Sequence, residues 1–212
     1  MNFGNILIIG DSYSTFEGFV PEGYAIYYSS SGGDTDVRKM EETWWHQVIS
    51  QTDSNLVLNN SWSGSTICYT GYENRDCSKD SSFIFRFNQL KEKGFFKENK
   101  IDTVFIFGGT NDSWSNAPLG EPLLSDWKRE DLYKVLPAIG NLAYILRETL
   151  PDSKIVWLIN TEIKEQIGEV IKKACELFGE EYVAFKYIDK IAGHPTIKGM
   201  KDIKEQILEK LK

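Results

Sequence analysis

The sequence predicts an α/β fold built on five parallel strands, with helices on both faces of the sheet. Short apolar runs alternate along the chain with longer segments in which apolar residues recur every three or four positions. Continuous runs rich in β-branched and aromatic residues are typical of strands that are buried on both faces. Because strand and helix alternate, right-handed crossovers favour a doubly wound sheet.

The predicted strands are five short apolar runs, of which the last is the weakest. The first run stops at Gly10, the second at Asn59 and the third at Gly108. Such residues favour turns, so each run is bounded at its carboxyl end. In chain order the runs cover 6–9, 56–58, 103–107, 155–159 and 182–185.

The predicted helices occupy the intervals between these runs. Leucine, isoleucine and valine recur in them at helical spacing, which marks one apolar face on each helix. The last helix opens at Pro195 and Thr196, since proline is favoured in a first helical turn. In chain order the helices cover 44–49, 81–93, 132–146, 163–174 and 197–211.

Length and composition indicate one globular domain that spans residues 1–212. Hydrophobic residues make up 41% of the chain and charged residues 26%, which is typical of a protein that folds around its own core. The net charge is −7, and an acidic chain disfavours binding to nucleic acid or to anionic membranes. The sequence carries no signal for an oligomeric state.

Cysteine and histidine are too few and too scattered to indicate a metal site. The three cysteines are Cys68, Cys77 and Cys175, and no zinc-ligand spacing occurs. Cys68 and Cys77 share one polar stretch and are able to pair if the protein is exported. The N-terminus lacks the pattern of a signal peptide, and no stretch is long enough to span a membrane. We therefore expect a cytoplasmic protein, or an exported one if a leader has been removed.

Three long irregular segments follow strand ends, directly or after a helix. They cover residues 17–42, 61–80 and 112–128. Long loops in a compact domain are usually functional or disordered. In open α/β sheets ligands bind at the carboxyl edge, so these segments are expected to border a site.

Four residues after strand ends form a set that suits acyl transfer. Ser12 follows the first run, Gly64 the second, Asn111 the third and His194 the fifth. Each alone has an ordinary interpretation, as a helix cap or a turn residue. Together they supply a nucleophile, oxyanion donors and a general base at one sheet edge.

In this order Gly10-Asp11-Ser12, Gly64, Gly109-Thr110-Asn111-Asp112 and His194 resemble the four sequence blocks of the SGNH/GDSL hydrolases. The resemblance implies a three-layer α/β/α, flavodoxin-like domain with esterase or lipase-type activity. It assigns Ser12 as nucleophile and His194 as base. It also assigns the N–H groups of Ser12 and Gly64 and the amide of Asn111 as oxyanion donors, with no cofactor and no metal.

One block departs from the family pattern. The family usually has aspartate three residues before the histidine, and here that position is Ile191. Asp189 is the nearest upstream carboxylate and is a possible third member. We favour a Ser–His dyad in which a backbone carbonyl accepts the Nδ1 proton.

Aromatic residues in the second and third loops are candidates for substrate binding. They are Trp62, Tyr69, Tyr72, Trp114 and Trp127. Aromatic faces stack on sugar rings, and no apolar lid helix is evident. A small or carbohydrate-linked ester, such as an acetylated sugar, is therefore the favoured substrate.

Two other functions stay open at this point. An acyltransferase of the same fold would pass the acyl group to an alcohol instead of water. A non-catalytic, flavodoxin-like binding module would give His194 no special role. No phosphate-binding loop follows the first run to support the second alternative.

Overall fold

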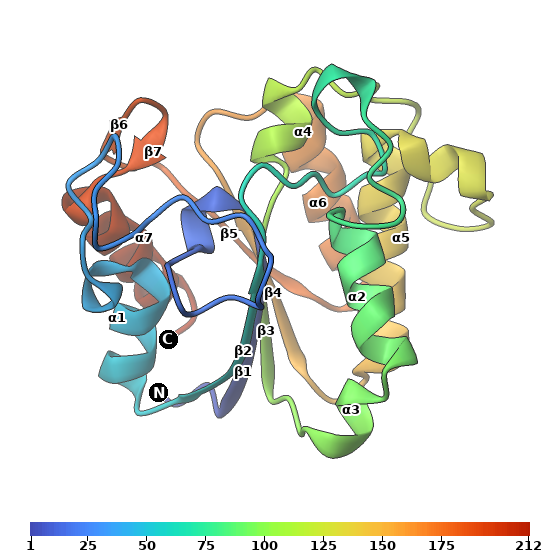
Figure 1. Ribbon diagram of the computed structural model, residues 1–212. Coiled ribbons are helices and arrows are strands. Elements are labelled where there is room, and N and C mark those ends of the chain that lie inside the picture. The colour runs from blue at the N-terminus through green and yellow to red at the C-terminus, as the bar shows by residue number, and fades with distance from the viewer.

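The computed structural model describes residues 1–212 and contains a five-stranded sheet in which all strands are parallel. The strand order is β2-β1-β3-β4-β5 (Figure 1). The predicted α/β class is confirmed, and all five predicted strands are present. They are β1 (Asn5–Gly10), β2 (Asn55–Ser61), β3 (Thr103–Phe107), β4 (Lys154–Ile159) and β5 (Glu181–Ala184).

Helices cover both faces of the sheet. Figure 1 shows α1 (Trp44–Thr52) and α7 (Ile197–Lys210) on one face. The other face carries α2 (Phe83–Glu92), α5 (Val135–Thr149) and α6 (Glu165–Phe178). Shorter helices lie in the connections: α3 (Phe95–Glu98), α4 (Thr110–Trp114), η1 (Ser12–Ser14), η2 (Met40–Glu42), η3 (Tyr72–Asn74) and η4 (Arg129–Tyr133).

The hydrophobic core consists of two clusters, one on each face of the sheet. Along β1, Leu7 and Ile9 belong to the cluster beneath α2, α5 and α6. The alternate residues Ile6 and Ile8 belong to the cluster beneath α1 and α7. Successive side chains of a strand point to opposite faces, so a strand that is buried on both sides must be apolar throughout. This explains the continuous run at residues 6–9.

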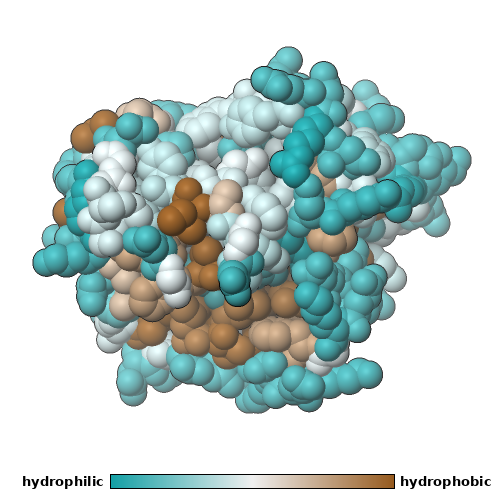
Figure 2. Space-filling view, in the orientation of Figure 1, coloured by the Kyte–Doolittle hydropathy of each residue, from teal (hydrophilic) through white to brown (hydrophobic).

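The edge strand β2 is less buried than the central strands. Its residues Leu56, Val57 and Leu58 are only half-buried. Figure 2 shows hydrophobic residues gathered in a band across the lower half of this view, between the two helical layers and surrounded by hydrophilic residues. An edge strand lacks a neighbour on one side, so part of its apolar surface stays accessible.

Strand register brings three loops to one place at the carboxyl edge. Gly10 at the end of β1 lies opposite Ser61 on β2 and opposite Phe107 on β3. The segments that follow these strands therefore leave the sheet side by side. In the order 2-1-3-4-5 the connections reverse direction between β1 and β3, which is where such folds bind ligands.

The structure adds details that periodicity alone does not give. The helix predicted at 132–146 begins as η4, and α5 itself starts at Val135. Pro137 is tolerated in its first turn because N–H groups there have no helical partner. A short antiparallel hairpin, β6 (Lys190–Ile191) with β7 (His194–Pro195), was not predicted.

All three cysteines are buried and free. None of the helices has the length and apolar character needed to cross a bilayer.

Candidate active site

Ser12 is the first residue of the short helix η1, directly after β1. The Asp11 carboxylate caps this helix by accepting a hydrogen bond from the N–H of Tyr13 at 3.0 Å. Glycine is required at position 10, because a Cβ there would lie 2.6 Å from the Ser61 hydroxyl oxygen. Burial raises the pKa of Asp11 to about 7. The cap and the candidate nucleophile are thus adjacent residues of one turn.

His194 is carried by the β6–β7 hairpin and reaches Ser12 from the other end of the chain. Its Nε2 lies 3.0 Å from the Ser12 hydroxyl oxygen. The turn of the hairpin consists of Ala192 and Gly193, with φ angles of 49° and 76°. Two successive residues with positive φ make the tight turn that suits a two-residue hairpin. The turn therefore fixes the backbone position of His194, from which the imidazole extends toward Ser12.

The second ring nitrogen of His194 faces the hairpin itself. Nδ1 lies 3.1 Å from the backbone carbonyl of Ala192. A carbonyl only accepts hydrogen bonds, so Nδ1 carries the proton and Nε2 keeps its lone pair for the Ser12 hydroxyl. Burial lowers the pKa of His194, which favours the neutral imidazole. This geometry matches a dyad whose base is oriented by a main-chain carbonyl.

Asp189 makes no hydrogen bond or ion pair with His194. Its carboxylate accepts a hydrogen bond from the Thr196 hydroxyl at 2.5 Å and lies 3.6 Å from the Lys198 ammonium group. The hydrogen bond from Thr196 lowers the pKa of Asp189. Its backbone carbonyl accepts from the N–H of Thr196, at the start of α7. The contacts of Asp189 are thus those of a residue that anchors a helix terminus.

The three candidate oxyanion donors come from three neighbouring loops. The backbone N–H groups of Ser12 and Gly64 donate to no group of the protein. Gly64 has a φ of 80° in the turn after β2. The Asn111 amide nitrogen, in α4, donates to the Ser65 carbonyl at 3.0 Å, which ties it to the Gly64 turn. Its amide oxygen accepts from the Tyr72 hydroxyl at 2.8 Å, which leaves one amide hydrogen free.

A family model described as GDSL-like Lipase/Acylhydrolase matches residues 4–211. The chain belongs to this family. It is a carboxylic ester hydrolase, as the four motifs predicted, and the alternative of a non-catalytic binding module is set aside. No group of three or more histidine, cysteine, aspartate or glutamate side chains is placed to hold a metal ion.

Solved structures resemble this GDSL-like hydrolase over nearly its whole length. A candidate GDSL-like lipase from Bacteroides ovatus is 40% identical with a TM-score of 0.91, covering 98% of this chain and 97% of its own. Another from Bacteroides uniformis is 38% identical with a TM-score of 0.90, covering 98% and 95%.

A third similar structure is a family two carbohydrate esterase from Clostridium thermocellum, in complex with cellohexaose. It is 16% identical with a TM-score of 0.65, covering 98% of this chain and 63% of the esterase. At that identity the likeness shows the fold alone. No curated protein matches the chain significantly.

Two buried charged residues, whose roles the sequence did not reveal, hold the loops of this hydrolase in place. The Arg86 guanidinium donates to the Gly10 carbonyl and the Ser65 hydroxyl, each at 3.1 Å, and to the Asn60 carbonyl. The Asp112 carboxylate accepts from the N–H groups of Ile67 and Cys68. Arg86 thus joins the ends of β1 and β2 to the Gly64 turn, and Asp112 joins α4 to the loop that follows β2.

The structure brings only some of the predicted aromatic residues to the site. The Trp114 ring contacts the His194 ring edge-on at 5.7 Å and is 38% exposed, and Tyr72 is 43% exposed. Trp62 packs on Tyr24, with ring centroids 4.4 Å apart.

Two of the predicted substrate-binding rings pack away from Ser12 and His194. Tyr69 is buried against Tyr133, because the loop folds its ring into the core. Trp127 packs on Tyr144 and donates to the Leu123 carbonyl. Neither ring contacts Ser12 or His194, so neither belongs to the candidate substrate surface.

Sequence reasoning missed two rings that flank the candidate base. The Tyr27 ring is stacked on His194, with centroids 3.6 Å apart and planes at 11°. The Tyr13 ring lies 5.5 Å from it on a tilted plane. The signal for Tyr13 was its place directly after Ser12. Tyr27 lies within the 17–42 loop, which was predicted to border a site without naming a residue.

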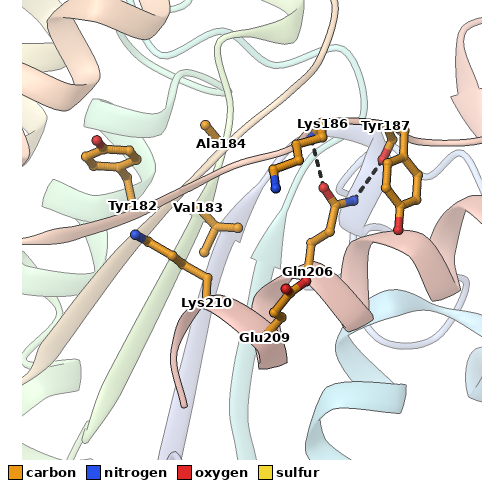
Figure 3. A pocket seen from close by; sticks show the side chains of 8 residues that line it. All are labelled: Tyr182, Val183, Ala184, Lys186, Tyr187, Gln206, Glu209 and Lys210. Atoms are coloured by element: carbon orange, nitrogen blue, oxygen red, sulfur yellow. Dashed lines mark hydrogen bonds between the residues drawn. The ribbon is translucent and has the colours of Figure 1, made fainter.

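A hollow of about 450 Å³ lies at the other edge of the sheet, between β5 and α7 (Figure 3). Gln206 spans part of it, accepting from the N–H of Lys186 and donating to the Tyr187 carbonyl, each at 2.8 Å. None of its lining residues is a candidate catalytic residue. This hollow is therefore separate from the candidate active site of the hydrolase.

Proposed function

We propose that this GDSL-like hydrolase cleaves esters through an acyl-enzyme formed on Ser12, with His194 as general base. The observation that carries the proposal is the 3.0 Å contact between the Ser12 hydroxyl oxygen and Nε2 of His194. This distance lies within the hydrogen-bond range needed for proton transfer from a nucleophile to its base.

The first half-reaction forms the ester bond to the protein. His194 Nε2 takes the hydroxyl proton as the Ser12 oxygen attacks the substrate carbonyl carbon. The negative charge on the carbonyl oxygen is stabilised by the N–H groups of Ser12 and Gly64 and by the Asn111 amide. The tetrahedral intermediate collapses, and the His194 imidazolium returns the proton to the leaving alkoxide.

The second half-reaction releases the acid. Water loses a proton to His194 Nε2 as its oxygen attacks the acyl carbon, through the same oxyanion donors. The intermediate expels the Ser12 oxygen, which recovers its proton from the imidazolium. No step requires a carboxylate, because the Ala192 carbonyl accepts a hydrogen bond from the Nδ1–H group of His194 in every step.

The proposed substrate is a small or carbohydrate-linked ester, with an acetylated sugar as the favoured case. Trp114 beside His194 and Tyr72 beside Asn111 offer partly exposed aromatic surface at the rim. Flat apolar rings of this kind contact the faces of sugars while leaving polar groups solvated. The carbohydrate esterase from Clostridium thermocellum shares the fold and supports this class.

A fluorophosphonate probe tests the mechanism, since it reacts with an activated serine. We expect the wild-type protein to be labelled and to hydrolyse p-nitrophenyl acetate. Ser12→Ala should abolish labelling and reduce turnover to less than about a thousandth. Ser50→Ala, at an exposed serine on α1, serves as the matched control and should behave as wild type. Labelling that persists in a folded Ser12→Ala variant contradicts the assignment.

A panel of esters tests the substrate class. We expect faster turnover of acetylated oligosaccharides than of octanoyl esters of the same alcohol. Trp114→Ala should raise KM for the sugar esters with less effect on p-nitrophenyl acetate. Preference for the octanoyl esters would overturn the substrate proposal and leave the dyad standing.

A further inference from the structure

His194 lacks a carboxylate partner, and its backbone partner does not tie it to the rest of the protein. The Ala192 carbonyl belongs to the turn of the same hairpin, two residues away. It moves with the imidazole whenever the hairpin moves. The hydrogen bond to Ser12 has to be made and broken during the reaction. An element outside the hairpin must therefore fix the ring.

Tyr27 is placed to do this. Its ring covers one face of the imidazole at 3.6 Å with an angle of only 11° between the planes. The hydrogen bonds at Nδ1 and Nε2 lie near the ring plane and resist rotation within it. A ring stacked on the face resists tilting out of that plane. The two kinds of contact together define one orientation of His194.

The segment that carries Tyr27 is bound to three of the four segments that meet at the site. The N–H of Tyr27 donates to the Thr15 hydroxyl, which itself donates to the Ser12 carbonyl. The buried Tyr28 hydroxyl donates to the Pro195 carbonyl at 3.0 Å. The Ala25 carbonyl accepts from the N–H of Ser63 at 2.8 Å. Residues 25–28 thus link the nucleophile turn, the hairpin and the Gly64 turn.

The ring of Tyr27, rather than its hydroxyl, makes this contact. The hydroxyl oxygen is buried and has no hydrogen-bond partner. When His194 takes the proton it becomes a cation, and the neutral Ala192 carbonyl adds no opposite charge. The face of an aromatic ring attracts a cation within about 6 Å. Stacking therefore becomes stronger as the reaction proceeds.

We propose that Tyr27 is the positioning residue for His194 and takes over the orienting role that a carboxylate has in a catalytic triad. The inference rests on the proposed function, because it assumes that His194 is the base. Asp34 is the alternative orienting group. Burial is the largest cause of the pKa shifts of Tyr27 and His194, and the charge of this exposed carboxylate adds to the rise at Tyr27 and opposes the fall at His194.

The test compares Tyr27→Leu, Tyr27→Phe and Asp34→Asn on p-nitrophenyl acetate. We expect Tyr27→Leu to lower kcat about tenfold, equivalent to about 1.4 kcal/mol, with KM within about twofold. Tyr27→Phe should keep kcat within about twofold, since the ring is retained. Phe19→Leu, at an exposed aromatic residue of the same loop, is the matched control and should keep the wild-type kcat. Circular dichroism checks folding, and Tyr27→Met replaces Tyr27→Leu if that variant is unfolded.

Each other outcome overturns the inference. An unchanged kcat in Tyr27→Leu removes the orienting role, and an equal loss in Tyr27→Phe assigns the effect to the hydroxyl. A change in KM alone would show that Tyr27 contacts the substrate. A loss of kcat in Asp34→Asn with an unchanged kcat in Tyr27→Leu would show that the Asp34 charge orients His194. Fluorophosphonate labelling distinguishes failure of the proposed function from failure of this inference. Wild-type protein that is not labelled overturns the proposed function and this inference together, whereas Ser12-dependent labelling at an unchanged rate in Tyr27→Leu overturns only the inference.

Discussion

The side-chain amide of Asn111 is fixed at both of its ends. The Tyr72 hydroxyl donates to its oxygen, and its nitrogen donates to the Ser65 carbonyl. These bonds decide which end of the amide is the donor, because the Ser65 carbonyl only accepts hydrogen bonds. A donor that is already oriented costs no reorganisation when charge develops on a substrate oxygen.

Asn111→Ala should therefore lower kcat by about 10²–10³, with little change in KM. Asn111→Asp is the matched variant, because it keeps the shape and removes the N–H group. We expect it to lose at least as much activity. Steady-state kinetics on p-nitrophenyl acetate measure both variants. A rise in KM alone would make Asn111 a binding or capping residue.

Asp189→Asn is expected to retain kcat within about tenfold of wild type. The Asp189 carboxylate contacts Thr196 and Lys198 and makes no hydrogen bond or ion pair with the imidazole. In a triad the loss of the acid costs about 10⁴ in kcat. A loss of three orders of magnitude in a folded variant would show that Asp189 is the third catalytic residue.

At the scale of elements, the β6–β7 hairpin determines where the base stands. Gly193 has a φ of 76°, and a Cβ there would lie 2.9 Å from the Trp114 ring. Gly193→Ala should lower the free energy of unfolding by about 1–2 kcal/mol. Because displacement of a catalytic group is costly, kcat should fall by about ten- to a hundredfold.

Gly179→Ala is the matched control for this hairpin variant. Gly179 also has a positive φ, of 65°, at the end of α6, and no atom lies within 4 Å of its added Cβ. It should lose similar stability in urea denaturation and keep the wild-type kcat. Equal kcat in the two glycine variants would show that the hairpin does not set the position of His194.

The sequence was sufficient to predict the long elements and insufficient for the hairpin. β1 and α6 each repeat one pattern over several residues, and burial on a defined face imposes that pattern. β6 and β7 have two residues each, which is too short for any period. The contact of His194 with Ala192 was expected only as an unnamed backbone carbonyl, since turn geometry decides which one it is.

The positions of other site residues differed in how far the sequence could predict them. Arg86 lies three residues after Phe83 and one before Phe87, on the predicted inner face of a helix, so its burial was open to prediction. A charge in that position needs polar partners, and the ends of β1 and β2 supply them. Tyr27 lies in an irregular loop, where the path of the chain follows from tertiary contacts alone.

At the scale of the whole molecule, buried carboxyl groups make stability depend on pH, and Glu180 is one of them. Glu180 accepts a hydrogen bond from the Trp157 indole at 2.7 Å, and burial raises its pKa from 4.5 to about 7. The folded state therefore holds a proton that the unfolded state has released. The protonated Glu180 carboxyl group makes its full contribution to the free energy of unfolding below pH 4.5. As the pH rises from 4.5 through 7 this contribution is lost, which costs on the order of 3 kcal/mol.

Glu180→Gln should remove this dependence while keeping an acceptor for Trp157. We expect its free energy of unfolding to fall less than that of wild type between pH 4.5 and pH 7.5, measured by urea denaturation. Asp11 acts in the same sense and is present in both proteins, so the difference between the two curves isolates Glu180. Glu181→Gln, at the exposed neighbour, should keep the wild-type curve shape. Parallel curves for Glu180→Gln and wild type would contradict the assignment.

The two members of the proposed dyad lie 182 residues apart in the chain. During synthesis Ser12 leaves the ribosome 182 residues ahead of His194, which emerges only after all five strands of the sheet have been made. Under the proposed mechanism, a nascent chain cannot hydrolyse esters until the β6–β7 hairpin has brought His194 to Ser12. The onset of ester turnover in a translation reaction should therefore measure when this hairpin has folded into place.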